Sequence, residues 1–148
     1  MQVFKFQKNT ADIHRSVVTI GNFDGIHLGH HALISTAVQE SKTRGCVSAL
    51  VTFDPHPQEI VHSKKSVSRI STPVHQLRLL EKIGLDELHV IPFTKELSQM
   101  PPEEFALQFL IKCFDLAKLV IGYDFRFGKY RAGDFKLLEN LSQKYNFS

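Results

Sequence analysis

The stretch TIGNFDGIHLGHH (residues 19–31) decides how this chain folds. Within it, histidines stand between and after three glycines, Gly21, Gly25 and Gly29. Glycine weakens a strand or a helix unless the backbone must turn sharply or something must approach it closely. The run before the glycines is apolar, as in a buried strand, and the residues after them have helical spacing. The stretch therefore predicts a strand, a tight turn and the start of a helix.

The rest of the chain repeats this alternation of strand and helix. Short apolar runs rich in β-branched residues predict four strands, at residues 16–23, 46–53, 87–93 and 117–125. Apolar stripes predict four helices: Leu33, Ile34, Ala37 and Val38, ended by Gly45; Val74, Leu77, Leu80 and Ile83, ended by Gly84; Phe105, Phe109, Leu110, Cys113 and Phe114, opened by Pro101; and Leu137, Leu138, Leu141 and Tyr145 after the N-cap residue Asp134.

This order indicates one α/β domain with a parallel sheet between two layers of helices, a three-layer α/β/α arrangement. Ligands of such sheets bind beyond the carboxyl ends of the strands. Residues 21–31, 54–57, 93–98 and 122–134 should therefore lie together along one edge of the sheet. The polar stretch at residues 62–72 is typical of a surface loop and is a candidate lid. Residues 141–148 suggest a further strand beginning after the last helix.

Composition excludes several classes of function. The chain has 148 residues, 43% of them hydrophobic, and a formal net charge of +3. That charge suits an anionic ligand but is too small to indicate nucleic acid. The sequence contains neither an apolar run of membrane-spanning length nor a signal peptide, and Cys46 and Cys113 are expected to be reduced. We therefore expect a cytoplasmic protein with no membrane partner.

The first helix start has the features of a phosphate site. Unpaired N–H groups and a partial positive charge gather there, and Gly25 and Gly29 leave the backbone open to phosphate oxygens. His27 and His30, three residues apart, can project from one side of this start. The stretch has neither the lysine of a Walker A loop nor the G-x-G-x-x-G spacing of dinucleotide sites. Structural histidines, or a zinc site made by His27, His30 and His56, are the alternatives.

A second candidate segment is YDFRFGKYRAGDF, residues 123–135. Aromatic residues alternate in it with Arg126, Lys129 and Arg131. Rings stack on aromatic side chains and guanidinium groups hold phosphates, so the segment suits a flavin nucleotide or an adenine. Alternatively, its aromatic residues fold back onto the core. The turn TFDPHP (residues 52–57) carries His56, whose role is structural or functional.

Together these motifs resemble a known family. GNFDGIHLGH is similar to the H-x-G-H signature of nucleotidyltransferases, whose Rossmann-like fold the resemblance implies. TFDPHP, FTKELSQMPPEEFALQFL (residues 93–110) and IGYDFRFGKYRAGDF (residues 121–135) follow in the order of the bacterial bifunctional riboflavin kinase/FMN adenylyltransferases, or FAD synthetases. The resemblance covers essentially the whole chain. It implies that residues 1–148 form an FMN adenylyltransferase domain, incomplete at its C-terminal end, without the riboflavin kinase domain.

The resemblance also assigns roles to residues. It implies adenylyl transfer from ATP to FMN, giving FAD and pyrophosphate, with Mg²⁺ held mainly by substrate phosphates. The catalytic residues would be His27 and His30. ATP would be bound by Gly21, Asn22, Phe23, Asp24, Gly25, Gly29 and His56, and the flavin nucleotide by Asp124, Phe125, Arg126, Phe127 and Arg131.

Two features depart from the family pattern. The family's serine/threonine-rich turn ending in arginine is only faintly imitated by ISTPVHQLR (residues 70–78), which lies too early, and the kinase domain is missing. Two other functions stay open: an H-x-G-H nucleotidyltransferase acting on another phosphate, such as phosphopantetheine or glycerol phosphate, or a non-catalytic nucleotide- or RNA-binding module.

Overall fold

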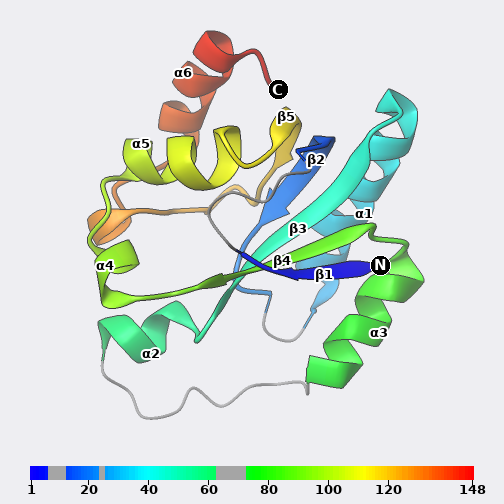
Figure 1. Cartoon of the computed structure of the whole chain (residues 1–148), viewed down its shortest axis with the longest axis horizontal. Coiled ribbons are helices and arrows are strands. Elements are labelled where there is room, and N and C mark those ends of the chain that lie inside the picture. The colour runs from blue at the N-terminus through cyan, green and yellow to red at the C-terminus, as the bar shows by residue number, and fades with distance from the viewer. Residues whose placement is uncertain (7–12, 24–25, 63–72) are drawn as a thin grey trace.

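The computed structural model describes residues 1–6, 13–23, 26–62 and 73–148. Its centre is a sheet in the order β1-β4-β3-β2-β5, in which every neighbouring pair is parallel. The strands are β1 (Gln2–Lys5), β2 (Arg15–Ile20), β3 (Val47–Asp54), β4 (Glu87–Pro92) and β5 (Asp115–Val120). Helices lie on both sides of this sheet (Figure 1). The expected parallel α/β fold in three layers is therefore confirmed.

Among the described strands, β1 is the one that the sequence did not predict. It has four residues at the edge of the sheet, and three of them are exposed. Burial on both faces produces the apolar run that marks the other four strands. An edge strand this short gives no such run, which explains the omission.

Two groups of helices cover the two faces. Helices α1 (Leu28–Arg44) and α3 (Pro73–Ile83) lie on one face, and α5 (Pro102–Phe105), the π-helical segment η1 (Ala106–Ile111) and α6 (Phe135–Tyr145) lie on the other (Figure 1). All four predicted helices are present, the third as an α-helix that continues into a π-helix. The short α2 (Pro57–Val61), α4 (Lys95–Ser98) and the 3₁₀ turn η2 (Lys129–Arg131) were not predicted.

The buried side chains alternate between the two faces. In β2, Val18 and Ile20 pack in the cluster that includes Phe105, Phe109 and Leu138, whereas Val17 packs with Ala37 of α1.

Helix ends also follow the predicted signals. Gly45 ends α1 in a left-handed conformation with φ of 63°, and the Asp134 side chain accepts a hydrogen bond from the Leu137 N–H at the start of α6.

Two residues of the predicted apolar stripes are exposed. Val74, near the start of α3, is 60% exposed, and Tyr145, expected to face inward with Leu141, is 37% exposed. Tyr145 is the last residue of α6, and the following Asn146 turns the chain back with φ of 57°. After that turn the Ser148 N–H donates to the Ala117 carbonyl, and the Ser148 carbonyl accepts from the Leu119 N–H at 2.7 Å. Ser148 therefore pairs with the backbone of β5, although the structure assigns no strand to the described residues after α6.

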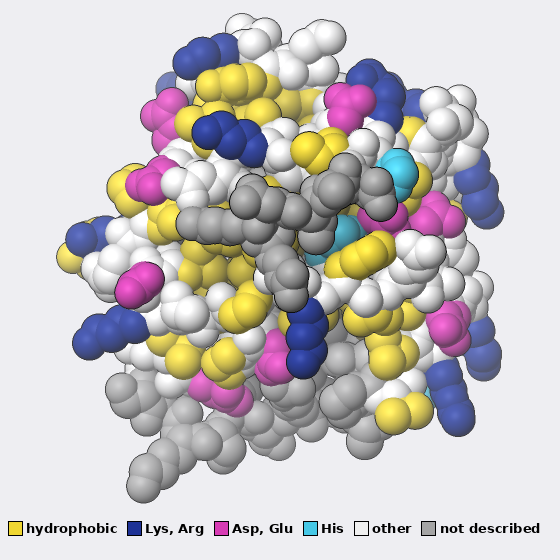
Figure 2. Space-filling view, in the orientation of Figure 1, with side chains coloured by type: hydrophobic (Ala, Val, Ile, Leu, Met, Phe, Trp, Pro, Cys, Tyr) yellow, Lys and Arg dark blue, Asp and Glu magenta, His cyan; other side chains and the backbone are white. Residues whose placement is uncertain are grey.

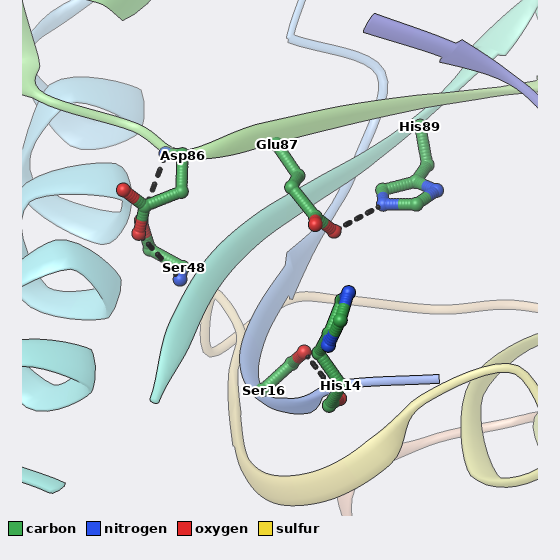
Figure 3. Close-up of polar contacts among 6 residues, drawn as sticks. All are labelled: His14, Ser16, Ser48, Asp86, Glu87 and His89. Atoms are coloured by element: carbon green, nitrogen blue, oxygen red, sulfur yellow. Dashed lines mark hydrogen bonds and ion pairs between the residues drawn. The ribbon is translucent and has the colours of Figure 1, made fainter. Parts of the chain in front are cut away.

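Polar side chains fix the ends of the strands opposite the predicted site (Figure 3). The Asp86 carboxylate accepts hydrogen bonds from the Ser48 N–H at 2.9 Å and the Ser48 hydroxyl at 2.7 Å. On β4, His89 Nε2 lies 2.8 Å from a carboxylate oxygen of Glu87. The Asp86–Ser48 hydrogen bonds join the residue before β4 to the start of β3, whereas the Glu87–His89 contact lies within β4.

Two further expectations concern cysteines and membranes. Both cysteines are free, and burial raises the pKa of the Cys113 thiol. Within the described ranges, no helix combines the length and the apolar character that crossing a membrane requires. On the face that Figure 2 shows, Lys and Arg side chains are scattered among acidic ones.

An ion-pair network joins α1 to β5. A carboxylate oxygen of Glu40 lies 3.1 Å from Lys118 Nζ and 3.2 Å from Arg44 Nε. Hydrogen bonds from Lys118 and then from Arg44 hold the pKa of Glu40 below its ordinary value of 4.5. A carboxylate whose pKa is lowered by folding stabilises the fold above the unfolded pKa, and this contribution disappears as the pH falls through the folded pKa.

Replacing Glu40 with Gln should therefore lower the free energy of unfolding at neutral pH and have a smaller effect at an acidic pH below the unfolded pKa of 4.5. Urea unfolding at both pH values measures the difference, which should be small because the pair is partly exposed. The exposed Glu139→Gln on α6 is the matched control. Equal effects of Glu40→Gln at the two pH values would contradict this assignment.

Candidate functional site at the carboxyl edge of the sheet

The order of the strands creates a natural site. The chain passes from β2 to β3 on one side and later returns to β5 on the other side of β2. At such a reversal the two connections leave in opposite directions, and a crevice opens beyond the strand ends. The segments that follow β2, β3, β4 and β5 therefore share one edge, as predicted, and α1 begins at the reversal.

His27 is the N-cap residue of α1. Its Nδ1 accepts hydrogen bonds from the Gly29 N–H at 3.1 Å and from the His30 N–H at 3.4 Å. An Nδ1 atom that accepts carries no proton, so the neutral ring has its proton on Nε2. The cap therefore fixes the tautomer of His27 and leaves one N–H donor away from the helix.

This differs from the sequence interpretation in one respect. Gly29 was expected to open the backbone to a phosphate group. Instead, a Cβ atom at Gly29 would lie 3.1 Å from Cε1 of His27, so the glycine makes room for the protein's own imidazole. In this structure the ring already accepts hydrogen bonds from the N–H groups of Gly29 and His30 at the helix start.

His27 and His30 do lie side by side. Their rings are stacked with centroids 3.7 Å apart and an angle of 22° between planes. The ring of Phe23 meets His30 edge-on, with centroids 5.0 Å apart. The predicted pair of imidazoles is thus assembled, with Phe23 packed behind it.

The turn before the helix is tightly folded. Phe23 is buried and has φ of 40°, a left-handed conformation that is rare for an aromatic residue. A Cβ atom at Gly21 would lie 3.1 Å from the Phe23 ring, so only glycine fits there without a shift. Asp24 and Gly25, also predicted to bind ATP, lie outside the described residues.

Two side chains missed by the sequence analysis hold this turn. Thr52 Oγ1 donates to the Asn22 carbonyl at 3.4 Å, and Gln76 Nε2 donates to the Phe23 carbonyl at 3.2 Å. Gln76 lies on α3, 53 residues away. No local pattern in the sequence could have paired it with this turn.

An open cavity of about 260 Å³ lies beside the turn. Asn22, Phe23 and His56 line it together with Asp54 and Gln76, and the apolar side chains of Leu50, Leu77, Leu80 and Val90 form its other walls. His56 is itself an N-cap, because its Nδ1 accepts from the Gln58 N–H at 3.1 Å at the start of α2. Like His27, His56 thus presents its Nε2 side away from a helix start.

The loop after β5 lies on the other side of α1. A Cβ atom at Gly122 would lie 3.2 Å from Oδ1 of Asp124 and 3.8 Å from Cδ1 of Leu33, which places this end of the loop against α1. Tyr123 and Tyr130 are almost fully exposed, and Arg126 and Arg131 are exposed as well. The loop thus offers these rings and guanidinium groups to solvent.

The phenylalanines of this loop behave differently. Phe127 is buried in the core against Phe105, and Phe125 stacks on Phe127 with centroids 5.5 Å apart. This is the folded-back arrangement that the sequence had left open for its aromatic residues. Phe127 exchanges two backbone hydrogen bonds with Gly133, which closes the loop.

The loop is also fixed from outside. Gly128 has φ of 73°, and a Cβ atom there would lie 2.5 Å from Cα of Pro102. Next to it, the Lys129 N–H donates to the Met100 carbonyl at 2.8 Å. Only glycine allows this close approach, so the loop and the start of α5 are locked together.

Metal binding by protein side chains alone finds no support. Among the residues that the structure describes, no three His, Cys, Asp or Glu side chains gather to hold a metal ion. The alternative zinc site of His27, His30 and His56 is therefore wrong: the first two rings stack on each other, and His56 caps a different helix.

Comparison with known proteins gives a consistent result. A family model described as FAD synthetase matches residues 9–148. Proteins described as bifunctional riboflavin kinase/FMN adenylyltransferase are similar to the chain. The one from Buchnera aphidicola subsp. Schizaphis graminum (strain Sg) is 35% identical, over 89% of this chain and 42% of that protein. The one from Escherichia coli (strain K12) is 34% identical, over 88% of this chain and 42% of that protein. The chain thus spans under half the length of these relatives.

Solved structures share the fold. A crystal structure titled as a macrolide-efflux protein from Streptococcus pneumoniae has a TM-score of 0.80 and 26% identity, and covers 94% of this chain and 46% of that one. A universal stress protein from Archaeoglobus fulgidus has a TM-score of 0.53 and 17% identity over 91% and 90% of the two chains, a likeness of fold alone.

The cap at His27 can be tested through stability. His27→Ala should lower the free energy of unfolding by about 1 kcal/mol, because two N–H groups lose their acceptor. His27→Asn should restore most of that loss, since asparagine is a good N-cap residue. Urea unfolding measures both variants, with the neighbouring His31→Ala as control. Equal stability of the alanine and asparagine variants would show that the cap contributes nothing.

Proposed function

This chain belongs to the FAD synthetase family, and we propose that it transfers the adenylyl group of ATP to FMN. The observation that carries the proposal is the stacked pair of His27 and His30 at the start of α1, at the strand-order reversal of a parallel sheet. The family model spans this site, and the relatives are named for FMN adenylylation. The riboflavin kinase activity in the relatives' names is not part of the proposal for this chain, which matches under half their length.

In the proposed reaction a phosphate oxygen of FMN attacks the α-phosphorus of ATP. A new P–O bond forms, the bond from that phosphorus to the bridging oxygen breaks, and pyrophosphate leaves with the electron pair. Such transfers need little covalent help from the protein, so positioning and electrostatics account for catalysis. The Nε2–H of His27 is a fixed donor that can face the charge developing on the phosphate oxygens.

The two substrates are proposed to approach the histidine pair from opposite sides. On one side, Asn22, Phe23 and His56 line the apolar cavity, and the family resemblance assigns them to ATP. On the other side, Asp124, Phe125, Arg126 and Arg131 lie on the loop after β5, and the family resemblance assigns them to FMN. Phe127 is buried in the core and anchors that loop.

Magnesium is proposed to arrive with ATP. Phosphate oxygens are the usual ligands of Mg²⁺ in such reactions, and the ion neutralises charge on the phosphates. The described residues offer no group of three side chains that would hold the ion without the nucleotide. The protein's contribution is then to orient the phosphates. The cytoplasmic location expected from the sequence stays part of the proposal.

His30→Ala tests the proposed mechanism. Turnover with ATP and FMN should fall about a hundredfold, the usual effect of removing one preorganised donor, with little change in unfolding free energy. FAD formation is followed by the loss of flavin fluorescence. His31→Ala, one position along on α1, should keep its activity. Near-normal turnover by His30→Ala would remove this histidine from the mechanism.

His56→Asn tests the side on which ATP binds. Asparagine keeps a capping acceptor for α2 but removes the imidazole from the cavity. The KM for ATP should rise about tenfold, with kcat within about threefold of the original, because a binding contact is lost. His62→Asn at the other end of α2 is the control. A rise in the KM for FMN instead would exchange the two assignments.

A further inference from the structure

The turn at residues 21–23 makes three hydrogen bonds to two other elements of the chain, β3 and α3. The Gly21 N–H donates to the Val51 carbonyl at 3.1 Å, and Thr52 donates to the Asn22 carbonyl. The third contact is the hydrogen bond from Gln76 Nε2 to the Phe23 carbonyl at 3.2 Å. Of these three partners, Val51 and Thr52 lie in the sheet, whereas Gln76 lies on a helix, α3.

The residue that accepts this hydrogen bond is under strain. Phe23 has φ of 40°, and only surrounding contacts keep a bulky residue in such a conformation. Its side chain packs with Ile34, Leu80 and Leu85, and its carbonyl is held by Gln76. The backbone orientation at Phe23 therefore depends on a contact with α3.

Phe23 in turn sets the position of the histidine pair. Its ring meets His30 edge-on at 5.0 Å, and His30 stacks on His27 at 3.7 Å. A series of direct contacts thus runs from Gln76 through Phe23 to both imidazoles. A small rotation of the Phe23 peptide would move its ring relative to His30.

We propose that Gln76 is a positioning residue for the reaction at His27 and His30, acting through the main chain of Phe23. This inference rests on the proposed function. It goes beyond that function because the sequence analysis gave Gln76 no role and the relatives' names do not point to α3. Gln76 also lines the cavity, so direct contact with a nucleotide ring is the competing explanation. The two explanations differ in which kinetic constant changes.

The test replaces Gln76 with Met and with Lys. Methionine keeps the length of the side chain and suits a helix but donates no hydrogen bond, whereas lysine retains a donor. In Gln76→Met, kcat should fall roughly tenfold with the KM values within about twofold, because one hydrogen bond and the alignment it fixes are lost. Gln76→Lys should keep more than about half of kcat. Gln143→Met, exposed on α6, is the matched control.

A spectroscopic readout separates this inference from the proposed function. In ¹⁵N–¹H spectra of the histidine rings without substrates, Gln76→Met should shift the signals of His30 and His27. The signals of His89, which packs against Phe114 on the opposite face, should not move. This measurement needs no activity. If the original protein forms no FAD, the proposed function fails, whereas unmoved His30 signals overturn the inference about Gln76.

A double-mutant cycle tests the route through Phe23. Phe23→Leu should reduce kcat, and adding Gln76→Met to it should cause little further loss, because both changes interrupt the same series of contacts. Independent effects that multiply would overturn the route. A rise in KM with unchanged kcat in Gln76→Met would show that Gln76 only contacts the ligand. Circular dichroism confirms that each variant is folded before the kinetics are compared.

Discussion

The parallel pairing of β2 with both of its neighbours is the constraint on which the rest of the structure depends. Parallel strands cannot be joined by a tight hairpin, so each connection must cross a face of the sheet. All five described strands therefore end at the same edge. Because β3 pairs with one side of β2 and the later strand β5 pairs with the other, the start of α1, which follows β2, lies at the reversal of strand order. Residues far apart in the sequence meet there without any strong pairwise attraction between them.

At this edge the protein's own side chains accept hydrogen bonds from the N–H groups at two helix starts. The imidazole of His27 accepts from the N–H groups of Gly29 and His30, and the imidazole of His56 accepts from the Gln58 N–H of α2. Two histidines in the proposed site thus have a structural task and a fixed tautomer at once. The structural and the functional explanation of a histidine are not alternatives here. A side chain that caps a helix is held in place, and being held in place is what a donor to a phosphate group requires.

Much of the fold could be predicted from the sequence, because burial on both faces leaves long apolar runs and helix ends carry local signals such as Gly45 and Asp134. The edge strand β1 has too few buried residues to leave such a run. The histidine pair was also predictable, since its members are three residues apart. The cap at His27 was not, because it depends on how a ring turns. Gln76 lies 53 residues from its partner, and the burial of Phe127 depends on α5, so neither follows from a local pattern.

The contact between Gly128 and Pro102 has a consequence for protein engineering. Because the backbone of one segment rests on the backbone of the other, with a hydrogen bond from Lys129 to Met100 beside it, the two segments form one unit. A chimera that transplanted residues 122–134 alone into a related scaffold would lose the surface on which the loop rests. Successful grafts of substrate preference between relatives should carry residues 100–102 along with the loop, and natural sequence change in the two segments should be correlated.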